Sequence, residues 1–330
     1  MSEFKVDARM RVGLVAWALT GFAGRAAHAA PKRVMISTIV EVPQLIETKD
    51  GVIQGLAERG FVDGRDIKVE YLTANGNAST QQQIARKFVG DGADLIVAIT
   101  TPTAQAMISA TSSIPIVFAA VTDPIKAKLI PRFNAPGGNI TGVSDAPPLT
   151  AQLALFREIL PNLKKLGFVY NPGLDSSNAT LEHLRAEGAK LGVTVTEAAA
   201  PTTNEVIPAT RKLVGSVDAI YVPNDTTVVA ALETVVKIGQ ETRIPVFAGE
   251  TRAVDRGALA SVGLDYIEVG KAAGRMAAAI LGGAKPGEVD AVIAYRTMPN
   301  LVVVVNKRAA QAMGVTLPEA VLRKATRTVG

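Results

Sequence analysis

The residue types that carry most enzyme chemistry are scarce in this sequence, which has 330 residues, no cysteine and only two histidines. Without cysteine the chain has no thiolate nucleophile, no disulfide and no cysteine-ligated metal. It also lacks a phosphate-loop motif, an H-E-x-x-H zinc motif, and a glycine-rich dinucleotide motif after its first expected strand. His183 lies in a charged stretch, 181–187, typical of a solvated helix surface, which makes it a poor general base. We therefore predict that the chain is not an enzyme and uses neither a cofactor nor a metal.

Polar residues with ligand-binding chemistry stand where the expected strands end. In the first half of the chain these residues are Thr100, Thr101, Thr122 and Asp123, and in the second half they are Asn171, Asn224, Asp225, Thr226 and Glu250. Ligands of open parallel sheets bind at the carboxyl ends of the strands, where loops meet helix N-termini. Hydroxyls and helix N–H groups suit a carboxylate, whereas the side chains of Asp225 and Glu250 suit an ammonium group. Such residues also cap helices, so the prediction depends on their recurrence in both halves.

An enzymatic use of the same carboxylates is an alternative. Asp225 and Glu250 could in principle perform acid/base cleavage of a glycosidic bond. A sugar-binding cleft also needs aromatic platforms, however, and aromatic residues make up only 5% of the sequence. The composition therefore favours binding over catalysis.

The elements that would position these residues follow from the alternation of apolar strands with helical patterns, which is typical of α/β architecture with parallel sheets. Ser79 is expected to cap a helix that runs through Val89, Pro102 to open the next helix, and Asn306 to cap a terminal helix. The segments expected to form strands are 34–36, 67–71, 94–99, 114–118, 140–143, 166–170, 192–195, 218–222, 244–247, 258–262 and 301–305.

An internal repeat indicates how these elements are grouped. The segment Arg-Lys-Phe-Val-Gly at 86–90 precedes the strand at 94–99, and Arg-Lys-Leu-Val-Gly at 211–215 precedes the strand at 218–222. Each is followed by a helical pattern and then by a strand that begins Ile-Pro, at Ile114 and Ile244. Helices can resemble one another by chance, but two similarly wound lobes also agree with the two domains that the length suggests.

The N-terminal segment has the features of a secretory signal peptide. Lys5, Arg9 and Arg11 precede an apolar run at 12–23, and Ala27-His28-Ala29 supplies a small-residue cleavage site. The run is shorter than the ~20 residues that a transmembrane helix needs, although an N-terminal membrane anchor is the alternative. Cleavage near Ala29 or Ala30 would remove four of the 35 basic and two of the 30 acidic residues, which lowers the net charge from +5 to +3. The remaining charges alternate in sign, so we predict no nucleic-acid partner.

Several motifs together resemble the substrate-binding proteins of ABC transporters, of the type that takes up tryptophan or tyrosine. The resemblance covers about residues 32–318. The matching segments are Ala-Ile-Thr-Thr-Pro-Thr-Ala-Gln-Ala at 98–106, Ile-Pro-Ile-Val-Phe-Ala-Ala-Val-Thr-Asp-Pro at 114–124, Pro-Gly-Gly-Asn-Ile-Thr-Gly-Val-Ser-Asp at 136–145, Asp-Ala-Ile-Tyr-Val-Pro-Asn-Asp at 218–225, Ile-Pro-Val-Phe-Ala-Gly-Glu at 244–250 and Val-Val-Asn-Lys at 304–307.

This resemblance implies a type I periplasmic binding fold, in which each of two lobes is a doubly wound, mostly parallel sheet with helices on both faces. The expected signal peptide is 1–29, the first lobe 30–143 plus 266–297, and the second lobe 144–265 plus 298–330. Chain crossovers are expected near 143–147, 264–266 and 298–300. The implied function is capture of a small molecule by hinge closure, with an aromatic or branched apolar amino acid as the expected ligand. The implied partners are a membrane permease and an ATPase. The protein is expected to be a monomer, free in the periplasm, because a lipoprotein needs an N-terminal cysteine.

The resemblance also assigns site residues to this chain. Thr100, Thr101, Thr122 and Asp123 would line one lobe, Asn171, Asn224, Asp225, Thr226 and Glu250 the other, with Ser144, Asp145 and Asp265 near the crossovers. One loop departs from the family pattern, because Val-Pro-Gln-Leu-Ile at 42–46, preceded by Glu41, stands where many relatives have His-Pro-Ala-Leu-Asp. That loop contacts ligand in relatives, so Glu41 is a further candidate. Other small carboxylates or aromatic acids, a role in feeding a membrane sensor, and an exported α/β enzyme remain alternatives.

Overall fold

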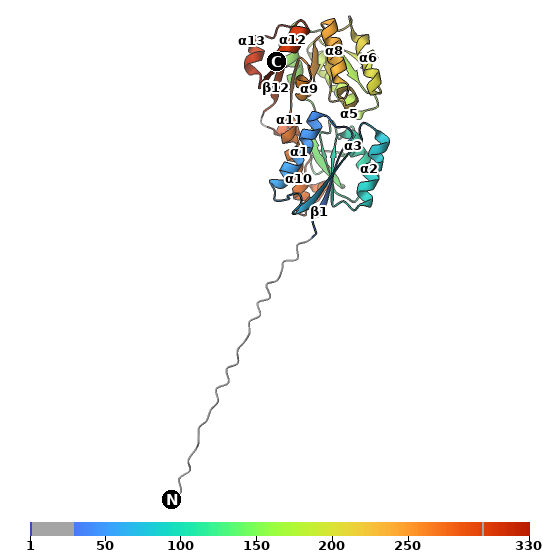
Figure 1. Cartoon of the computed structure of the whole chain (residues 1–330), viewed down its shortest axis with the longest axis vertical. Coiled ribbons are helices and arrows are strands. Elements are labelled where there is room, and N and C mark those ends of the chain that lie inside the picture. Colours follow the sequence, from blue (N-terminus) through green and yellow to red (C-terminus); the bar gives the residue numbers. More distant parts are fainter. Residues whose placement is uncertain (2–29, 299) are drawn as a thin grey trace. The chain divides into compact units, whose positions relative to one another are not determined.

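The computed structural model describes residue 1, residues 30–298 and residues 300–330 (Figure 1). The predicted signal peptide lies outside the described residues, apart from Met1. Residues 31–330 form one compact unit, which contains all the helices and strands named below. None of the described helices is long and apolar enough to cross a membrane.

The first sheet has six parallel strands in the order β11-β5-β4-β3-β1-β2. Its side chains alternate between two cores, as the two-residue period of a strand requires. Val34 and Ile36 belong to the core beneath α1 and α10, whereas Met35 belongs to the core beneath α2 and α3, and Figure 1 shows the two helix pairs on opposite sides of the sheet. The strands are β1 (Lys32–Thr38), β2 (Ile67–Thr73), β3 (Leu95–Ile99), β4 (Ile116–Ala119), β5 (Ile140–Ser144) and β11 (Val292–Ile293); the helices are α1 (Pro43–Ala57), α2 (Ala78–Gly90), α3 (Thr101–Ala110), α10 (Tyr266–Leu281) and α11 (Ala294–Thr297), with a 3-10 turn at Pro286–Glu288.

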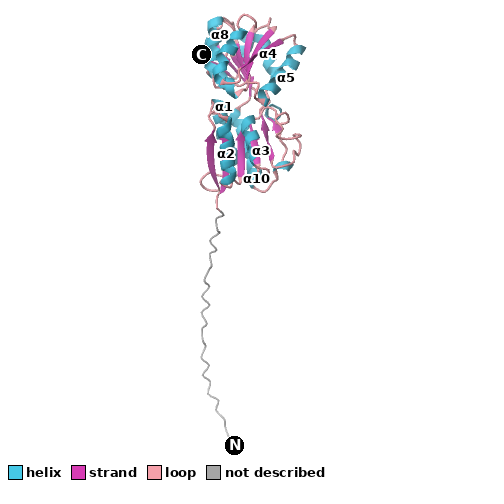
Figure 2. Ribbon diagram, turned by 90° about the vertical axis from the view of Figure 1, so that its right-hand side faces the viewer, coloured by secondary structure: helices cyan, strands magenta, loops and turns pink. Residues whose placement is uncertain are grey.

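The second sheet has seven strands in the order β13-β12-β10-β9-β8-β6-β7, with β12 antiparallel to β10. Helices also cover this sheet (Figure 2). The strands are β6 (Lys165–Tyr170), β7 (Thr194–Ala199), β8 (Ala219–Val222), β9 (Val246–Ala248), β10 (Ala260–Gly263), β12 (Val302–Asn306) and β13 (Arg327–Val329); the helices are α4 (Leu149–Ile159), α5 (Asp175–Lys190), α6 (Val206–Leu213), α7 (Thr226–Val229), α8 (Leu232–Thr242), α9 (Arg252–Asp255), α12 (Lys307–Ala312) and α13 (Glu319–Lys324), with a 3-10 turn at Thr203–Glu205.

The two sheets repeat one winding. In the first, β5-β4-β3-β1-β2 are neighbours in that order, and in the second, β10-β9-β8-β6-β7 follow the same order. The prediction of two similarly wound α/β lobes is therefore confirmed. We call the first sheet with its helices the first lobe, and the second sheet with its helices the second lobe. The residue limits predicted for each lobe stay a prediction.

The chain passes between the sheets three times: after β5, after β10 and after α11. These passages fall at the crossovers expected from the sequence, although Pro299, in the third, lies outside the described residues. One predicted cap is wrong. Asn77, not Ser79, caps α2, because its side chain accepts a hydrogen bond from the Thr80 N–H at 2.9 Å and leaves Ser79 inside the first turn.

Helices α1 and α10 pack backbone to backbone through glycines. A Cβ atom at Gly51 would overlap the carbonyl oxygen of Ile267, and one at Gly270 would overlap that of Thr48. Since only glycine allows so close an approach, these positions hold the two helices together in the first lobe. Both helices begin at the edge of the lobe that faces the second sheet, and residues of their first turns line a cavity there.

Candidate ligand-binding site

A small cavity of about 30 Å³ lies between the two lobes. Its wall comes from helix starts and strand ends of both sheets, which is where parallel α/β folds place their ligands. The lining residues are Gln44, Leu45, Thr100, Thr101, Pro102, Ala120, Thr122, Asp145, Ser176, Asn224, Thr226, Val229 and Tyr266. At this volume the cavity has room for about one or two water molecules, so a larger ligand requires the lobes to move apart.

Asp145 contributes the only carboxyl group among the described residues of this cavity wall. Its Oδ2 accepts hydrogen bonds from Asn224 Nδ2 at 3.2 Å and from the Tyr266 hydroxyl at 3.0 Å, and its Oδ1 accepts from the Thr122 hydroxyl at 3.3 Å. The residue is only 3% exposed, and none of the described lining residues is a cation. Burial raises the pKa of Asp145, and the hydrogen bonds from Tyr266, Asn224 and Thr122 oppose that rise.

Asn224 presents a free acceptor beside this carboxylate. Its Nδ2 is committed, because it donates to Asp145 and to the Tyr266 hydroxyl at 2.9 Å. Its Oδ1 is buried and has no hydrogen-bond partner among the described residues. This oxygen lies against Gly249, which is outside the cavity lining, so the cavity offers the Asp145 carboxyl group, and not the amide oxygen, to the N–H donors of a ligand.

The backbone that leads into α3, which forms part of the wall, is strained. Thr100 precedes the helix with φ 86°, and Ala120 after β4 has φ 51°, both in the region that favours glycine. Sheet and side-chain contacts hold this backbone: the Thr100 N–H donates to the Ala119 carbonyl at 3.0 Å, and the Thr100 hydroxyl lies 3.1 Å from that of Thr103. Strained backbone that the surroundings enforce is common at ligand sites.

Five helices begin at the cavity: α1, α3, α5, α7 and α10 all contribute residues of their first turns to its wall. A helix start offers unpaired backbone N–H groups and a partial positive charge. The hydroxyls of Thr101, Ser176 and Thr226 make no hydrogen bond to other described residues. Such a set suits the carboxylate of a ligand.

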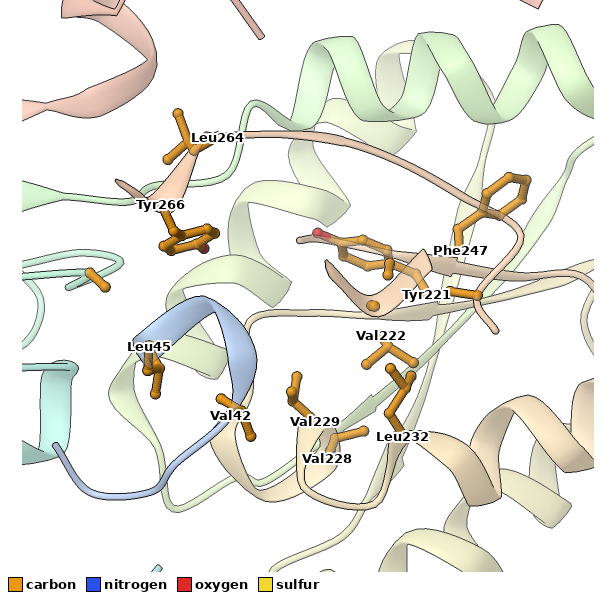
Figure 3. Close-up of a cluster of buried hydrophobic side chains, with 14 of the residues drawn as sticks. Val42, Leu45, Tyr221, Val222, Val228, Val229, Leu232, Phe247, Leu264 and Tyr266 are labelled. Carbon is orange, nitrogen blue, oxygen red and sulfur yellow. The ribbon is translucent and has the colours of Figure 1, made fainter. Parts of the chain in front are cut away.

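Apolar side chains complete the wall. Leu45 on α1, Val229 on α7 and Tyr266 on α10 belong to one buried cluster, which draws members from both lobes (Figure 3). The cavity therefore combines a carboxylate, a group of hydroxyls at helix starts and an apolar surface.

Six of the 13 residues predicted for the site line this cavity. They are Thr100, Thr101, Thr122, Asp145, Asn224 and Thr226. The other seven lie elsewhere, and any ligand contact by them stays a prediction. Asp123 and Ser144 line a neighbouring cavity of about 490 Å³, and Asn171 lines a third cavity, of about 600 Å³. Glu41 is exposed in the loop before α1, and Asp265 caps α10 by accepting from the Ile267 N–H at 2.9 Å.

Asp225 and Glu250, the two carboxylates predicted to hold an ammonium group, are both buried outside the cavity lining. Asp225 is saturated: it accepts from the Asn171, Thr227 and Val228 N–H groups and from the Ser177 hydroxyl. Glu250 Oε2 accepts from the Arg252 N–H at 2.6 Å, and Oε1 has no described partner. Burial raises the pKa of Asp225 and raises that of Glu250 to about 7.

Seven lining residues are not among the 13 predicted site residues, although two of them lie in the loop at 42–46 for which the family resemblance implies ligand contact. The seven are Gln44, Leu45, Pro102, Ala120, Ser176, Val229 and Tyr266. The sequence does contain a signal for some of them: Ser176 lies three residues after the turn residues Asn171-Pro172-Gly173, and Tyr266 follows the helix-capping Asp265. The apolar members have no such signal, because they are indistinguishable from core residues in a single sequence.

Polar contacts connect the lobes around the cavity. Lys126 pairs with Glu182, and Gln105 Nε2 donates to Asp175 at 2.7 Å. His183, predicted to be a solvated helix residue, is indeed exposed and lies 3.7 Å from Asp123. A further ion pair joins Arg252 in the second lobe to Glu47 in the first. Together with the small cavity volume, these contacts describe a closed arrangement of the lobes.

Two similarly wound lobes that meet over a small polar cavity define a solute-binding protein of the type I periplasmic binding fold. The family model for "ABC transporter substrate binding protein" matches residues 33–329. The chain belongs to this family and is therefore a substrate-binding protein of the ABC-transporter class.

Comparisons with individual relatives agree. The chain is 37% identical over 282 residues to a tyrosine-binding protein of Clostridioides difficile, covering 86% of this chain and 81% of that one. A structure from Streptococcus pneumoniae in complex with L-Trp is 36% identical with a TM-score of 0.86, covering 91% of this chain and all of that one. The ligand-free, open structure of a substrate-binding protein from Clostridium difficile is 35% identical, covers 90% of this chain and 99% of that one, and has a TM-score of 0.69. At nearly equal identity the TM-score is lower for the open structure, in agreement with closed lobes.

Proposed function

We propose that this protein captures an amino acid for an ABC importer and holds the α-ammonium group of the ligand on Asp145. The observation that carries the proposal is the buried carboxyl group of Asp145 between the lobes. It has three hydrogen bonds, and the described residues that line the cavity include no cation. A buried carboxylate without a cation is unfavourable, and the ammonium group of an amino acid would complement it.

The opposite end of the ligand would meet the helix starts. The hydroxyls of Thr101 and Ser176, with the N-termini of α3 and α5, suit its carboxylate. Leu45 and Val229 suit an apolar or aromatic side chain. The names of two relatives support this ligand class, because one is a tyrosine-binding protein and another was solved with L-Trp.

Hinge closure would couple binding to transport. Asp145 lies on the first connection between the sheets, and its partner Asn224 lies in the second lobe. A ligand that contacts both lobes stabilises the closed form at the expense of the open form. A cavity of about 30 Å³ is too small for an amino acid, so the ligand has to enter while the lobes are apart, and the ligand-bound closed form has to leave more space between the lobes than this arrangement does.

The family supports a role alongside other ABC-transporter components, and the specific partners we propose are a membrane permease and an ATPase. We further propose export through the signal peptide at 1–29, which rests on the sequence alone, and a monomeric periplasmic form without a lipid anchor. Since the relatives are binding proteins, we expect no turnover of the bound ligand.

Calorimetric titration of the twenty amino acids into the wild-type protein and into Asp145→Asn tests the proposal. The wild type should bind at least one amino acid. The variant should lose about 30-fold or more in affinity, since removing one partner of a buried charge pair costs at least roughly 2 kcal/mol.

Asp50→Asn is the matched control, because Asp50 lies on α1 outside the cavity lining and its side chain is about half exposed. Its affinity should stay within about threefold of the wild type, as expected for a partly exposed charge. An unchanged affinity in Asp145→Asn would contradict the assignment. Folded wild type that binds no amino acid would contradict the function itself.

A further inference from the structure

Gln44 places an unused amide in the cavity wall. The residue lies in the first turn of α1 and is 5% exposed. Its Oε1 is buried without a hydrogen-bond partner, and its Nε2 donates to no other described residue. Only its backbone carbonyl is engaged, by the Thr48 hydroxyl at 2.8 Å. Leaving a buried amide unpaired costs free energy, so such a group indicates a partner that is bound in another state of the protein.

The two ends that all amino acids share already have partners in the proposed site. The ammonium group has Asp145, and the carboxylate has the hydroxyls at the starts of α3 and α5. Gln44 belongs to neither set and makes no hydrogen bond to Asp145. Gln44 and Leu45 both line the cavity from the first turn of α1, so the amide and part of the apolar surface that would receive the ligand side chain come from the same helix start.

The charge of the wall limits what that side chain can be. Among the described lining residues, Asp145 is the only carboxylate, and there is no lysine, arginine or histidine. A charged ligand side chain would therefore be buried without a counter-ion, which is unfavourable. A neutral side chain with one hydrogen-bonding atom fits both the apolar wall and the free amide.

We propose, on the basis of the proposed amino-acid-binding function, that the Gln44 amide hydrogen-bonds the polar atom of the ligand side chain. In this role Gln44 is the residue that selects an aromatic amino acid with a side-chain donor, a phenol O–H or an indole N–H, over one without. Its Oε1 accepts the hydrogen bond from that donor. A site that hydrogen-bonds a substrate O–H or N–H discriminates strongly against the analogue that lacks it, because its own buried group is then left unpaired.

Titration calorimetry with L-Tyr, L-Trp and L-Phe on the wild type and Gln44→Met tests this assignment. The wild type should bind L-Tyr or L-Trp at least about tenfold more tightly than L-Phe. In Gln44→Met, which keeps the side-chain length and removes the amide, this preference should shrink to about twofold or less, while the affinity for L-Phe is retained or improved. The matched control is Gln54→Met, on the exposed side of the same helix, which should keep the wild-type preference.

The other possible outcomes would overturn either the role of Gln44 or the proposed function. An equal loss for all three ligands would show that Gln44 contacts the shared amino or carboxylate group, and it would overturn the proposal. Equal wild-type affinity for the three, or an unchanged preference in Gln44→Met, would overturn it as well. Absence of binding by folded wild type would refute the proposed function, which is a separate result. Thermal melts verify folding, and Gln44→Leu serves as a second variant should Gln44→Met be unstable.

Discussion

Glu250 should make the stability of this protein depend on pH in an unusual direction. The side chain is fully buried, its Oε2 accepts one hydrogen bond from the Arg252 N–H, and its Oε1 is unpaired among the described residues. Burial raises the pKa of Glu250 from the ordinary 4.5 to about 7, and the negative charge of Glu47 adds to the rise. The hydrogen bonds from the Ala253 and Arg252 N–H groups and the positive charge of Arg256 oppose it. The folded state therefore holds this proton more tightly than the unfolded state does.

The sign and size of the effect follow from this difference. Between pH 4.5 and about 7 the folded protein retains the Glu250 proton while the unfolded chain releases it, so the free energy of unfolding falls as pH rises. Each pKa unit corresponds to about 1.4 kcal/mol, which gives a total loss of roughly 3 kcal/mol. The contribution is fully present below pH 4.5 and is lost above pH 7.

Urea unfolding of the wild type and Glu250→Gln at pH 5, 6, 7 and 8 measures this contribution. Glutamine does not titrate, so the variant should gain stability relative to the wild type as pH rises, by about 2–3 kcal/mol between pH 5 and pH 8. Comparing the two proteins at each pH cancels the other titrating groups, including Asp145 and Asp225. Glu288→Gln, at an exposed site, should show no such trend. A stability difference that stays constant from pH 5 to pH 8 would refute the reasoning.

Two further predictions concern packing and the saturated carboxylate. Gly270→Ala should lower the free energy of unfolding by at least about 2 kcal/mol in urea titrations, because its Cβ has no space against α1, whereas Gly90→Ala, with open space around it, should be nearly neutral. Asp225→Ala should cost about 2–3 kcal/mol of stability, since it removes a helix cap and unpairs buried donors, but ligand affinity measured by calorimetry should stay within about threefold. Intact stability with lost affinity would instead support the sequence-based assignment of Asp225 to the ammonium group.

The sequence allowed the architecture to be predicted because strands, helices and the repeat all leave local patterns. The apolar run at 94–99 and the Ile-Pro starts at 114 and 244 correspond to β3, β4 and β9 within about two residues at each end. The polar residues at strand ends could also be collected, because the carboxyl ends of parallel strands share one edge of a sheet. Thr100 and Thr122 meet at the cavity for this reason, and Asn224 reaches it from the corresponding edge of the second sheet.

The roles of the carboxylates could not be predicted in the same way. Asp225 follows a strand as Asn224 does, yet its side chain turns back to cap α7, while Asn224 faces Asp145. One position along a loop reverses the direction of a side chain, and no local pattern reports that direction. Gln44 and Tyr266 reach the cavity through the packing of α1 on α10, which depends on contacts more than 200 residues apart in the sequence.

The glycine contacts between α1 and α10 also bear on the order of events during ligand capture. Both helices belong to the first lobe, and backbone atoms in direct contact leave them no freedom to slide without breaking the packing. Gln44 and Tyr266 lie in the first turns of α1 and α10, so the distance between them should stay the same while the lobes separate. An incoming ligand therefore binds first to the rigid part of the site on the first lobe, and the second lobe closes over it afterwards. Mutations on the first lobe should accordingly change the association rate, and those on the second lobe should change chiefly the lifetime of the complex.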